Sequence, residues 1–232
     1  MKENIVLLKH IQLFSSLTDQ ELLKISNKMK IKLFRKNETI LHEEDTNEYM
    51  YTILSGRVKV IQTTEDGRET IIAMHKTGEF FGEMSLIDGR TMPATVLAIE
   101  DTQTAIISKK EFTDLVSEQK KVLEKLLIIL CTRLRDSWNT IQMLNFNNAA
   151  QRMKMLFAIL CGEYGEKNGE GIILNIKLTH QNIANMAGIT RETVTRVIDK
   201  WQKDKEITIL KNKFICLHPA FLDTLPRLSS RR

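Results

Sequence analysis

Residues 78–96, GEFFGEMSLIDGRTMPATV, combine chemical groups that could hold a phosphorylated small molecule. The glycines allow tight turns, and the carboxylate of Glu83 can accept hydrogen bonds from hydroxyl groups. The guanidinium of Arg90 can neutralise a phosphate. The segment therefore indicates either a nucleotide-type pocket or a scaffold of that type that now binds something else.

A second stretch, residues 178–204 (LTHQNIANMAGITRETVTRVIDKWQKD), is typical of two helices joined by a tight turn. We expect Thr179 and Thr190 to cap the two helices and Gly188 to occupy the turn with a positive φ. Arginine can bind guanine through two hydrogen bonds, and glutamate can accept one from cytosine. The stretch therefore predicts a helix-turn-helix unit whose second helix reads DNA bases with Arg191, Glu192, Thr195 and Arg196.

The alternative interpretation of this second helix is a solvated charged face, with Glu192 and Arg196 as an ion pair one turn apart. The distribution of charge favours DNA binding instead. Residues 148–232 carry 14 Lys/Arg against 8 Asp/Glu, whereas residues 1–147 carry 20 against 21. All of the excess positive charge thus lies in the last third of the chain, which indicates a polyanionic partner for that part.

The secondary structure expected around these side chains changes along the chain from helices to strands and back to helices. Residues 5–30 are expected to be helical, with Thr18 as a cap and Glu21 three residues later. Between residues 31 and 108, short segments rich in β-branched residues predict a small antiparallel barrel or roll; the strand candidates are YMYTILSG, RVKVIQTT, ETIIAMHKTG, ATVLAIEDT and QTAIIS. Further on we expect a helix over 149–164, a turn in GEKNGEG and a strand in IILNIKL.

From Lys110 to Phe146 the pattern is helical without glycine or proline. Six apolar residues step by three and four along it: Leu123, Leu127, Leu130, Leu134, Ile141 and Leu144. Ser137 falls on the same seam and Trp138 beside it. About three heptads of seam predict a coiled-coil homodimer, and the alternative is that the helix packs on its own roll.

Composition narrows the class of protein. With 42% hydrophobic and 27% charged residues, the 232-residue chain is typical of a soluble protein, and no apolar stretch approaches the ~20 residues that cross a bilayer. We expect a cytoplasmic protein with no membrane partner. Cys131, Cys161 and Cys216 are dispersed, which favours buried thiols over a redox sensor and argues against zinc or iron–sulfur binding. No arrangement typical of catalysis is visible, so we do not expect an enzyme.

After the second helix, residues 207–217 (ITILKNKFICL) predict two strands whose turn carries Lys211 and Lys213, like a wing that contacts phosphates. The order of roll, long helix and winged helix-turn-helix resembles the CRP/FNR family of bacterial transcription regulators. LFSSLTDQELLKI, YMYTILSGRVKV and GEFFGEMSLIDG resemble its sensor domain, and ITRETVTRVI resembles its recognition helix. The resemblance covers residues 10–218 and implies three partners: double-stranded DNA, a second copy of the chain and RNA polymerase.

The resemblance implies an α+β architecture in three parts. Residues 1–109 would form a cyclic-nucleotide-binding-like β-roll sensor domain, 110–147 a long dimerisation helix and hinge, and 148–232 a winged helix-turn-helix domain. In the catabolite activator branch, R-E-x-x-x-R contacts a TGTGA half-site, and Arg191, Glu192 and Arg196 match that motif. Thr195 stands where that branch has glycine and the FNR branch has serine. By the same resemblance Thr179, His180, Gln181 and Thr190 would lie near DNA phosphates.

The resemblance also bears on the ligand of residues 78–96. In members that bind cyclic AMP, "GE" is followed by "RSA", whose arginine holds the phosphate. Gly82 and Glu83 match the first motif, but the second reads Met92-Pro93-Ala94, while Arg90 and Thr91 precede it. Where those members place Thr-Ser against the adenine, this chain has Ser137-Trp138. We therefore expect that the scaffold is retained and that cyclic AMP is not the effector.

Other effectors and functions stay open from the sequence. The iron–sulfur sensors of the family use cysteines near the N-terminus, and this chain has none before Cys131. Haem binding occurs in the family, but no histidine here has a distinctive spacing, and His75 is the best remaining candidate. The expected function is a DNA-binding regulator controlled by another signal or by none. The alternatives are a cyclic-AMP regulator that uses Arg90, or a small-molecule-binding module that acts on a protein partner.

Overall fold

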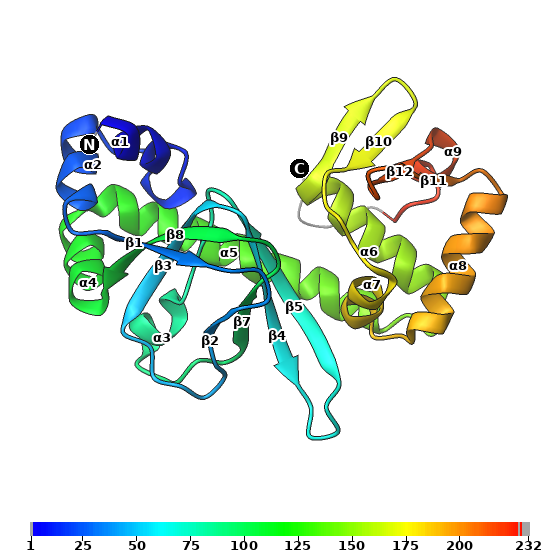
Figure 1. Ribbon diagram of the computed structural model, residues 1–232, viewed down its shortest axis with the longest axis horizontal. Helices are drawn as coiled ribbons and strands as arrows, with labels where there is room; N and C mark the ends of the chain where they lie inside the picture. The colour runs from blue at the N-terminus through cyan, green and yellow to red at the C-terminus, as the bar shows by residue number, and fades with distance from the viewer. Residues whose placement is uncertain (1, 227, 229–232) are drawn as a thin grey trace. The chain divides into compact units, whose positions relative to one another are not determined.

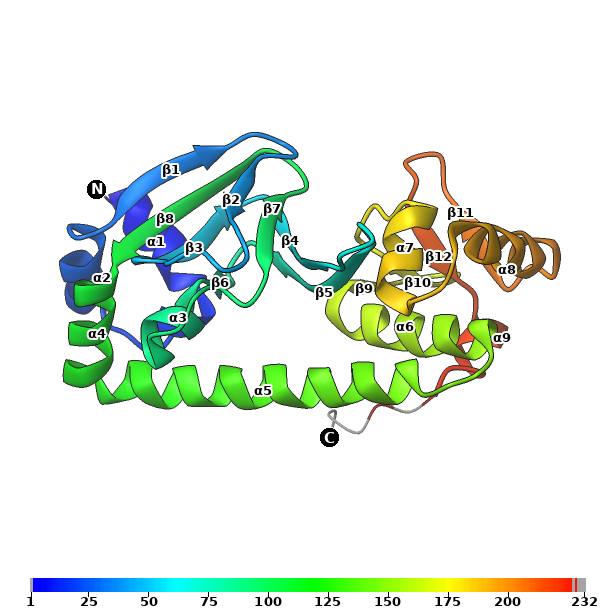
Figure 2. The ribbon, with the colours of Figure 1, turned by 90° about the horizontal axis from the view of Figure 1, so that it is seen from below.

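The computed structural model describes residues 2–226 and 228 (Figures 1 and 2). By internal contacts the chain divides into two compact units, Met1–Cys131 and Thr132–Arg232, and the long helix α5 (Lys120–Leu144) continues through the boundary. The functional division into 1–109, 110–147 and 148–232 stays a prediction. None of the helices in the described part of the chain is both long and apolar enough to cross a membrane.

Two four-stranded antiparallel sheets form the roll of the first unit. One has the order β1 (Lys30–Phe34), β8 (Thr102–Ser108), β3 (Tyr49–Ser55) and β6 (Phe80–Phe81). The other has the order β2 (Thr39–Leu41), β7 (Thr95–Ala98), β4 (Arg57–Thr63) and β5 (Glu69–Lys76). Strands of both sheets supply one apolar core, which contains Phe34, Leu41, Tyr51, Ile53, Val58, Phe81, Met92, Val96 and Ala98. The predicted antiparallel roll is confirmed.

The N-terminal helices are shorter than the sequence predicted. Residues 5–30 were expected to be helical throughout, but they hold the end of α1 (Lys2–Lys9), the 3-10 turn η1 (Gln12–Phe14) and α2 (Asp19–Ser26), and β1 already begins at Lys30. The predicted cap is confirmed, because Thr18 and Glu21 form a complete capping box. Strands β1, β2 and β6 were not predicted. Two of them have only two or three residues, too few to show an alternation of apolar and polar side chains.

The predicted continuous helix from Lys110 to Phe146 is wrong, because it is divided at Gln119. Helix α4 (Lys109–Glu118) ends there with φ −112° and ψ 89°, outside the helical region, and α5 starts at the next residue. Phe112 of α4 and Val122 of α5 are buried in the same apolar cluster with α1 and α2. The change of direction, visible in Figure 2, brings both helices onto that cluster. Neither glycine nor proline marks the break, so no local signal predicted it.

In the residues that the structure describes, the second unit combines the end of α5 and four further helices with a four-stranded antiparallel sheet, in the order β11 (Ile207–Ile209), β12 (Ile215–Leu217), β10 (Gly171–Leu174) and β9 (Gly165–Asn168). Its further helices are α6 (Ala149–Tyr164), α7 (His180–Ala187), α8 (Arg191–Lys203) and α9 (Pro219–Leu222). Three aromatic rings join α6, α8 and α9: the ring centres of Phe157 and Trp201 are 5.6 Å apart, and those of Trp201 and Phe221 are 4.8 Å apart. The predicted helix over 149–164 is confirmed.

The predicted turn over residues 165–171 is wrong in extent, because most of it pairs as strand. Gly165 to Asn168 form β9, which pairs with β10, and the turn itself is short. Charged and polar residues that are fully exposed on a hairpin carry no apolar alternation, so the sequence did not indicate a strand. Gly171 has φ 150°, and a Cβ atom there would lie 2.0 Å from the carbonyl oxygen of Leu217 on β12.

Burial of the thiols differs from the prediction at one position. Cys216 is buried in β12, which raises the pKa of its thiol, and Cys161 is partly buried. Cys131, expected to be buried, is exposed on α5. The misassignment follows from the helix itself, since α5 has an apolar outer face that the single chain leaves uncovered.

The backbone at Gly171 leads to a stability prediction. Gly171→Ala should destabilise the protein by about 1–3 kcal/mol or more, because the added methyl group meets the backbone of β12 in a conformation that other residues avoid. Urea unfolding followed by tryptophan fluorescence measures the change. Gly169→Ala is the matched control, because a Cβ atom there has no neighbour within 4 Å. Equal unfolding midpoints for the two variants would contradict this explanation.

Candidate DNA-binding surface and effector site

The helix-turn-helix unit is built as the sequence predicted. Thr179 caps α7 by accepting a hydrogen bond from the backbone N–H of Asn182 at 3.0 Å, and Thr190 caps α8 by accepting from that of Thr193 at 3.2 Å. Gly188 ends α7 with φ 62°, in the left-handed region. The faces that meet are apolar and buried; they include Ile183, Ala184, Ala187, Val194 and Ile198. This packing fixes the direction in which α8 presents its other face.

The outward face of α8 carries the predicted base-reading groups at its N-terminal end. Arg191, Glu192 and Arg196 are exposed, and Thr195 is partly buried. Hydrogen bonds from the backbone N–H of Glu192 itself and from Thr190, helped by the two arginines, lower the pKa of the Glu192 carboxyl group. This side chain is therefore a hydrogen-bond acceptor at neutral pH, beside two permanent donors. The three side chains together can address both a guanine and a cytosine.

Thr195 has a partner that the sequence did not indicate. Its hydroxyl donates to the carbonyl oxygen of Arg191 at 3.0 Å and lies 2.8 Å from Nδ1 of His180. The hydroxyl of Thr195 thus has two neighbours within hydrogen-bonding distance, one on each helix. The pair therefore links the start of α7 to α8, with the imidazole and the hydroxyl held in fixed positions. A bond between residues 15 positions apart leaves no signal in the spacing.

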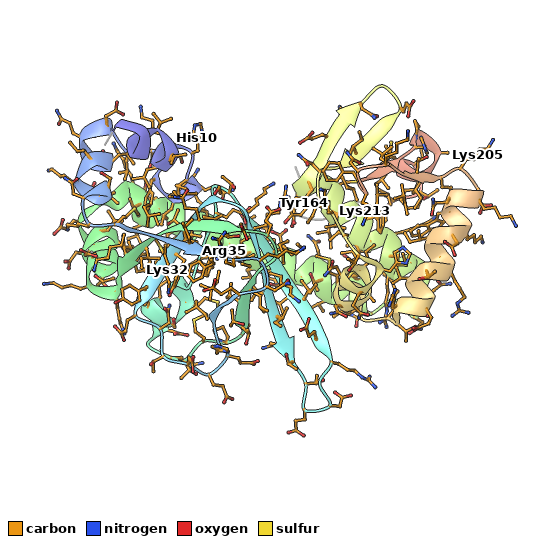
Figure 3. The ribbon with its side chains drawn as sticks, in the orientation of Figure 1. His10, Lys32, Arg35, Tyr164, Lys205 and Lys213 are labelled. Carbon is orange, nitrogen blue, oxygen red and sulfur yellow. The ribbon has the colours of Figure 1, made fainter. Side chains whose placement is uncertain are left out.

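The candidate phosphate contacts lie on the same unit, and several are already engaged with neighbours. Gln181 is exposed, and its Nε2 donates to Asn185 at 2.7 Å. The hydroxyl groups of Thr190 and Thr193 are 3.0 Å apart. Lys211 and Lys213 are exposed in the turn between β11 and β12, and Figure 3 marks Lys213, whose φ of 67° belongs to this tight turn. The wing predicted over residues 207–217 is thus present as a short hairpin.

In the first unit, the segment expected to be a phosphate-binding loop contains a six-residue helix, α3 (Glu83–Asp88). Gly82 precedes it with φ 85°, and the side-chain amide of Asn47 donates to the Gly82 carbonyl at 2.8 Å and to that of Tyr49 at 2.7 Å. A Cβ atom on Gly82 would lie 2.9 Å from the Tyr49 carbonyl oxygen, so glycine is required. Glu83, at the start of the helix, is only 2% exposed. Asn47 was not predicted, since it lies 35 residues away.

Glu83 and Arg90 are not brought together as a pocket would require. Arg90 and Thr91 are exposed, and the backbone N–H of Arg90 donates to the carboxylate of Asp88 at 3.0 Å. Arg90 also lies before β7, outside any strand. Met92 instead points inward: it is 5% exposed and belongs to the core of the roll.

The neighbours of Met92 in the core are apolar side chains and neutral hydrogen-bonding groups. The hydroxyl group of Ser85 donates to the Met92 sulfur at 3.4 Å. The backbone of Met92 is held on both sides, since its N–H donates to Asp45 and its carbonyl accepts from Glu44. His75, the candidate haem ligand, is engaged as well, with Nδ1 3.0 Å from the carboxylate of Glu79. In this arrangement the site has a buried carboxylate and no cation directed at it from Arg90.

The seam of α5 is an exposed apolar face along most of its length. Leu123, Leu127, Leu134, Ile141 and Leu144 are exposed, and Ile141 reaches 58%. Leu130, predicted as a seam residue, differs because it packs against the apolar cluster of the first unit. Ile128, at 60% exposed, takes part in the exposed face and was not predicted. Trp138 is 55% exposed, and the Ser137 hydroxyl donates within the helix to Arg133.

Comparison with known proteins agrees with this architecture. The cyclic nucleotide-binding domain model matches residues 31–119, and the Crp-like helix-turn-helix domain model matches residues 151–225. The chain is 29% identical to the cyclic AMP receptor protein of Thermus thermophilus over 191 residues, which is 82% of this chain and 85% of that protein. It is also 29% identical to the global nitrogen regulator of a Nostoc species over 194 residues, 83% of this chain and 87% of that protein.

Solved structures add the likeness of the fold. FixK2 from Bradyrhizobium japonicum superposes with a TM-score of 0.75 at 20% identity, covering 86% of this chain and 98% of that one. The structure contains, in chain order, a roll, a long helix and a capped helix-turn-helix with its wing. The two domain models match the sequence in the same order. The chain belongs to the CRP/FNR family of bacterial transcription regulators.

Proposed function

We propose that this chain is a homodimeric regulator that binds a TGTGA-like palindrome through two copies of α8. The observation that carries the proposal is the exposure of Arg191, Glu192 and Arg196 on the capped N-terminal turns of α8. Recognition helices of this kind enter the major groove, and the two copies of a dimer meet half-sites one helical turn apart. RNA polymerase is the further partner that regulation of transcription implies.

The dimer is supported by the exposed face of α5. An apolar stripe of this length is uncommon on the surface of a monomer, and it follows the three- and four-residue steps of a coiled coil. A second copy can cover it with the same residues about a two-fold axis. That arrangement also provides the two recognition helices that a palindromic site requires.

Control by a signal other than cyclic AMP, or activity without an effector, is supported by the residues around Glu83. Removing one partner of a buried charge pair typically costs 3–5 kcal/mol. For an arginine that binds a phosphate, this cost corresponds to a hundredfold or greater loss of affinity for the ligand. Here Met92 occupies the corresponding position within the core. Arg90 points to the surface in this structure, so its use would require rearrangement of residues 89–92.

The decisive experiment is fluorescence anisotropy of the purified protein on a labelled TGTGA-N6-TCACA duplex and on scrambled DNA at the same salt. We expect selective binding without cyclic AMP and no gain when it is added. Selective binding that appears only with cyclic AMP would favour the alternative regulator. Failure to bind any duplex at low salt would favour a module that acts on a protein partner.

Substitutions in α8 and in the wing should separate base reading from phosphate contacts. Arg191→Ala and Arg196→Ala should each weaken binding to the palindrome by about 1–3 kcal/mol and reduce discrimination against scrambled DNA. Lys213→Ala should weaken both duplexes evenly and lower the salt dependence by about one unit of slope. Anisotropy titrations over a series of salt concentrations provide both numbers. Losses of equal size on both duplexes for all three variants would refute the assignments.

The exposed seam predicts the oligomeric state of two matched variants. Ile141→Glu should raise the dimer dissociation constant by about a hundredfold or more, because it replaces apolar burial on both copies by a buried charge. Leu33→Glu is the control, since Leu33 is 71% exposed on β1, away from the seam. Sedimentation velocity over a concentration series distinguishes the two. A dimer that is unaffected by Ile141→Glu would place the interface elsewhere.

Calorimetry with cyclic AMP tests the effector site directly. We expect no binding at micromolar nucleotide for the native chain, because Met92 lies in the core of the roll at the position where the resemblance places a phosphate-binding arginine. Arg90→Ala is the informative companion variant. Micromolar binding that this substitution abolishes would show that Arg90 supplies the phosphate contact and that the proposal is wrong on this point.

A further inference from the structure

A cavity of about 350 Å³, which Glu83 does not line, lies in the first unit. Residues of α2 and α4, which are neighbours at the left of Figures 1 and 2, line it together with Ile107 of β8. Its volume falls within the range of about 300–1,000 Å³ that is usual for small-molecule sites. None of the residues that the sequence indicated for the effector lines it.

The interior of the cavity is apolar. Ile25 from α2, Ile107 from β8 and Leu115 from α4 line it, and all three are buried members of one apolar cluster. Their side chains can receive an aliphatic or aromatic group of a ligand, which would gain roughly 25 cal/mol for each Å² of apolar surface removed from water. The cavity therefore favours a ligand with one apolar end.

Two carboxylates at the cavity are fixed in place by the capping boxes of its two helices. Oε2 of Glu21 accepts from the backbone N–H and the hydroxyl of Thr18 at 2.7 and 2.8 Å. Oε2 of Glu111 accepts from the same two groups of Ser108 at 3.1 and 2.9 Å. In each case these bonds, the one to the backbone first, lower the pKa of the carboxyl group, so both are ionised at neutral pH. Both capping boxes use Oε2 of the glutamate.

Two ammonium groups and a third carboxylate, that of Glu118, complete the set of charged side chains that line the cavity. Lys24 and Lys28 line the cavity and are exposed, and their charges contribute to the lowered pKa of Glu21 and Glu111 respectively. The side-chain amides of Asn27 and Gln119 also line it. The cavity thus presents both signs of charge at its polar side and an apolar interior.

We propose that this cavity binds a free α-amino acid with an apolar side chain. The ammonium group of the ligand would lie against Glu21 and Glu111, its carboxylate against Lys24 and Lys28, and its side chain against the apolar interior. A ligand with a carboxylate alone would offer no ammonium group to Glu21 and Glu111 and would draw Lys24 and Lys28 away from them. A phosphorylated ligand would bring further negative charge to them, which the two lysines cannot balance.

The position of the cavity connects it to the long helix. Gln119, at the break between α4 and α5, lines it, and Leu115 shares its cluster with Val122 and Leu126 of α5. A ligand held between α2 and α4 therefore stabilises the segment from which α5 starts. The binding itself is independent of whether the second unit binds DNA.

Isothermal titration calorimetry of the full chain, without DNA, tests the proposal with L-leucine and L-phenylalanine as probes. Two analogues of leucine lack one charge each: 4-methylpentanoate has no ammonium group, and 3-methylbutylamine has no carboxylate. We expect at least one of the amino acids to bind and the matching analogues to bind about tenfold or more weakly, because a hydrogen-bonded charge is lost in each. No binding at millimolar amino acid, or equal affinities for amino acid and analogues, overturns the proposal.

A charge variant that keeps the fold assigns the binding to this cavity. Glu111→Gln removes the negative charge, while glutamine can still close the capping box with Ser108. It should weaken binding about tenfold or more in a protein that still unfolds cooperatively, with at most a small decrease in melting temperature, because the loss of the charge weakens the cap. Glu65→Gln, in the exposed tip between β4 and β5, is the matched control and should bind as the native chain does. Equal affinities for the two variants would place the ligand elsewhere and overturn the proposal.

Discussion

The orientation of α8 depends on the contact of three aromatic rings. Trp201, near the end of this helix, meets Phe157 of α6 edge-on at 79° and lies 4.8 Å from Phe221 of α9. Because all three rings are buried, the end of α8 is fixed by apolar contacts that tolerate little displacement. The other end is fixed by the Gly188 turn and the Thr190 cap. The charged groups between them are therefore presented by a rigid element, as base reading requires.

The sequence predicted those features whose causes are local. Thr18, Thr179 and Thr190 are caps because a side-chain oxygen reaches a backbone N–H three residues later, and the positive φ of Gly188 follows from the need for a tight turn. Roll, long helix and helix-turn-helix could be placed from such signals and from the resemblance to the family.

Features with distant causes could not be predicted. The break at Gln119 exists because α4 and α5 must both reach one apolar cluster, and nothing in the neighbouring residues requires it. Leu130 has the spacing of a seam residue, yet the same cluster partly buries it. Asn47 at Gly82 and His180 at Thr195 are contacts across 35 and 15 positions. At the candidate sites the sequence thus predicted which residue types are present, but it did not predict the residues to which they hydrogen-bond.

The exposed stripe on α5 has a consequence for how the protein responds to its own abundance. Under the proposed assembly, a palindrome is occupied by two chains that must first associate. Below the dissociation constant of the pair, the concentration of pairs varies with the square of the concentration of single chains. A twofold change in synthesis then becomes a fourfold change in the DNA-binding species. The apolar face of one helix would thereby make the occupancy of the DNA site depend more steeply on protein concentration than it does for a protein that binds as a single chain.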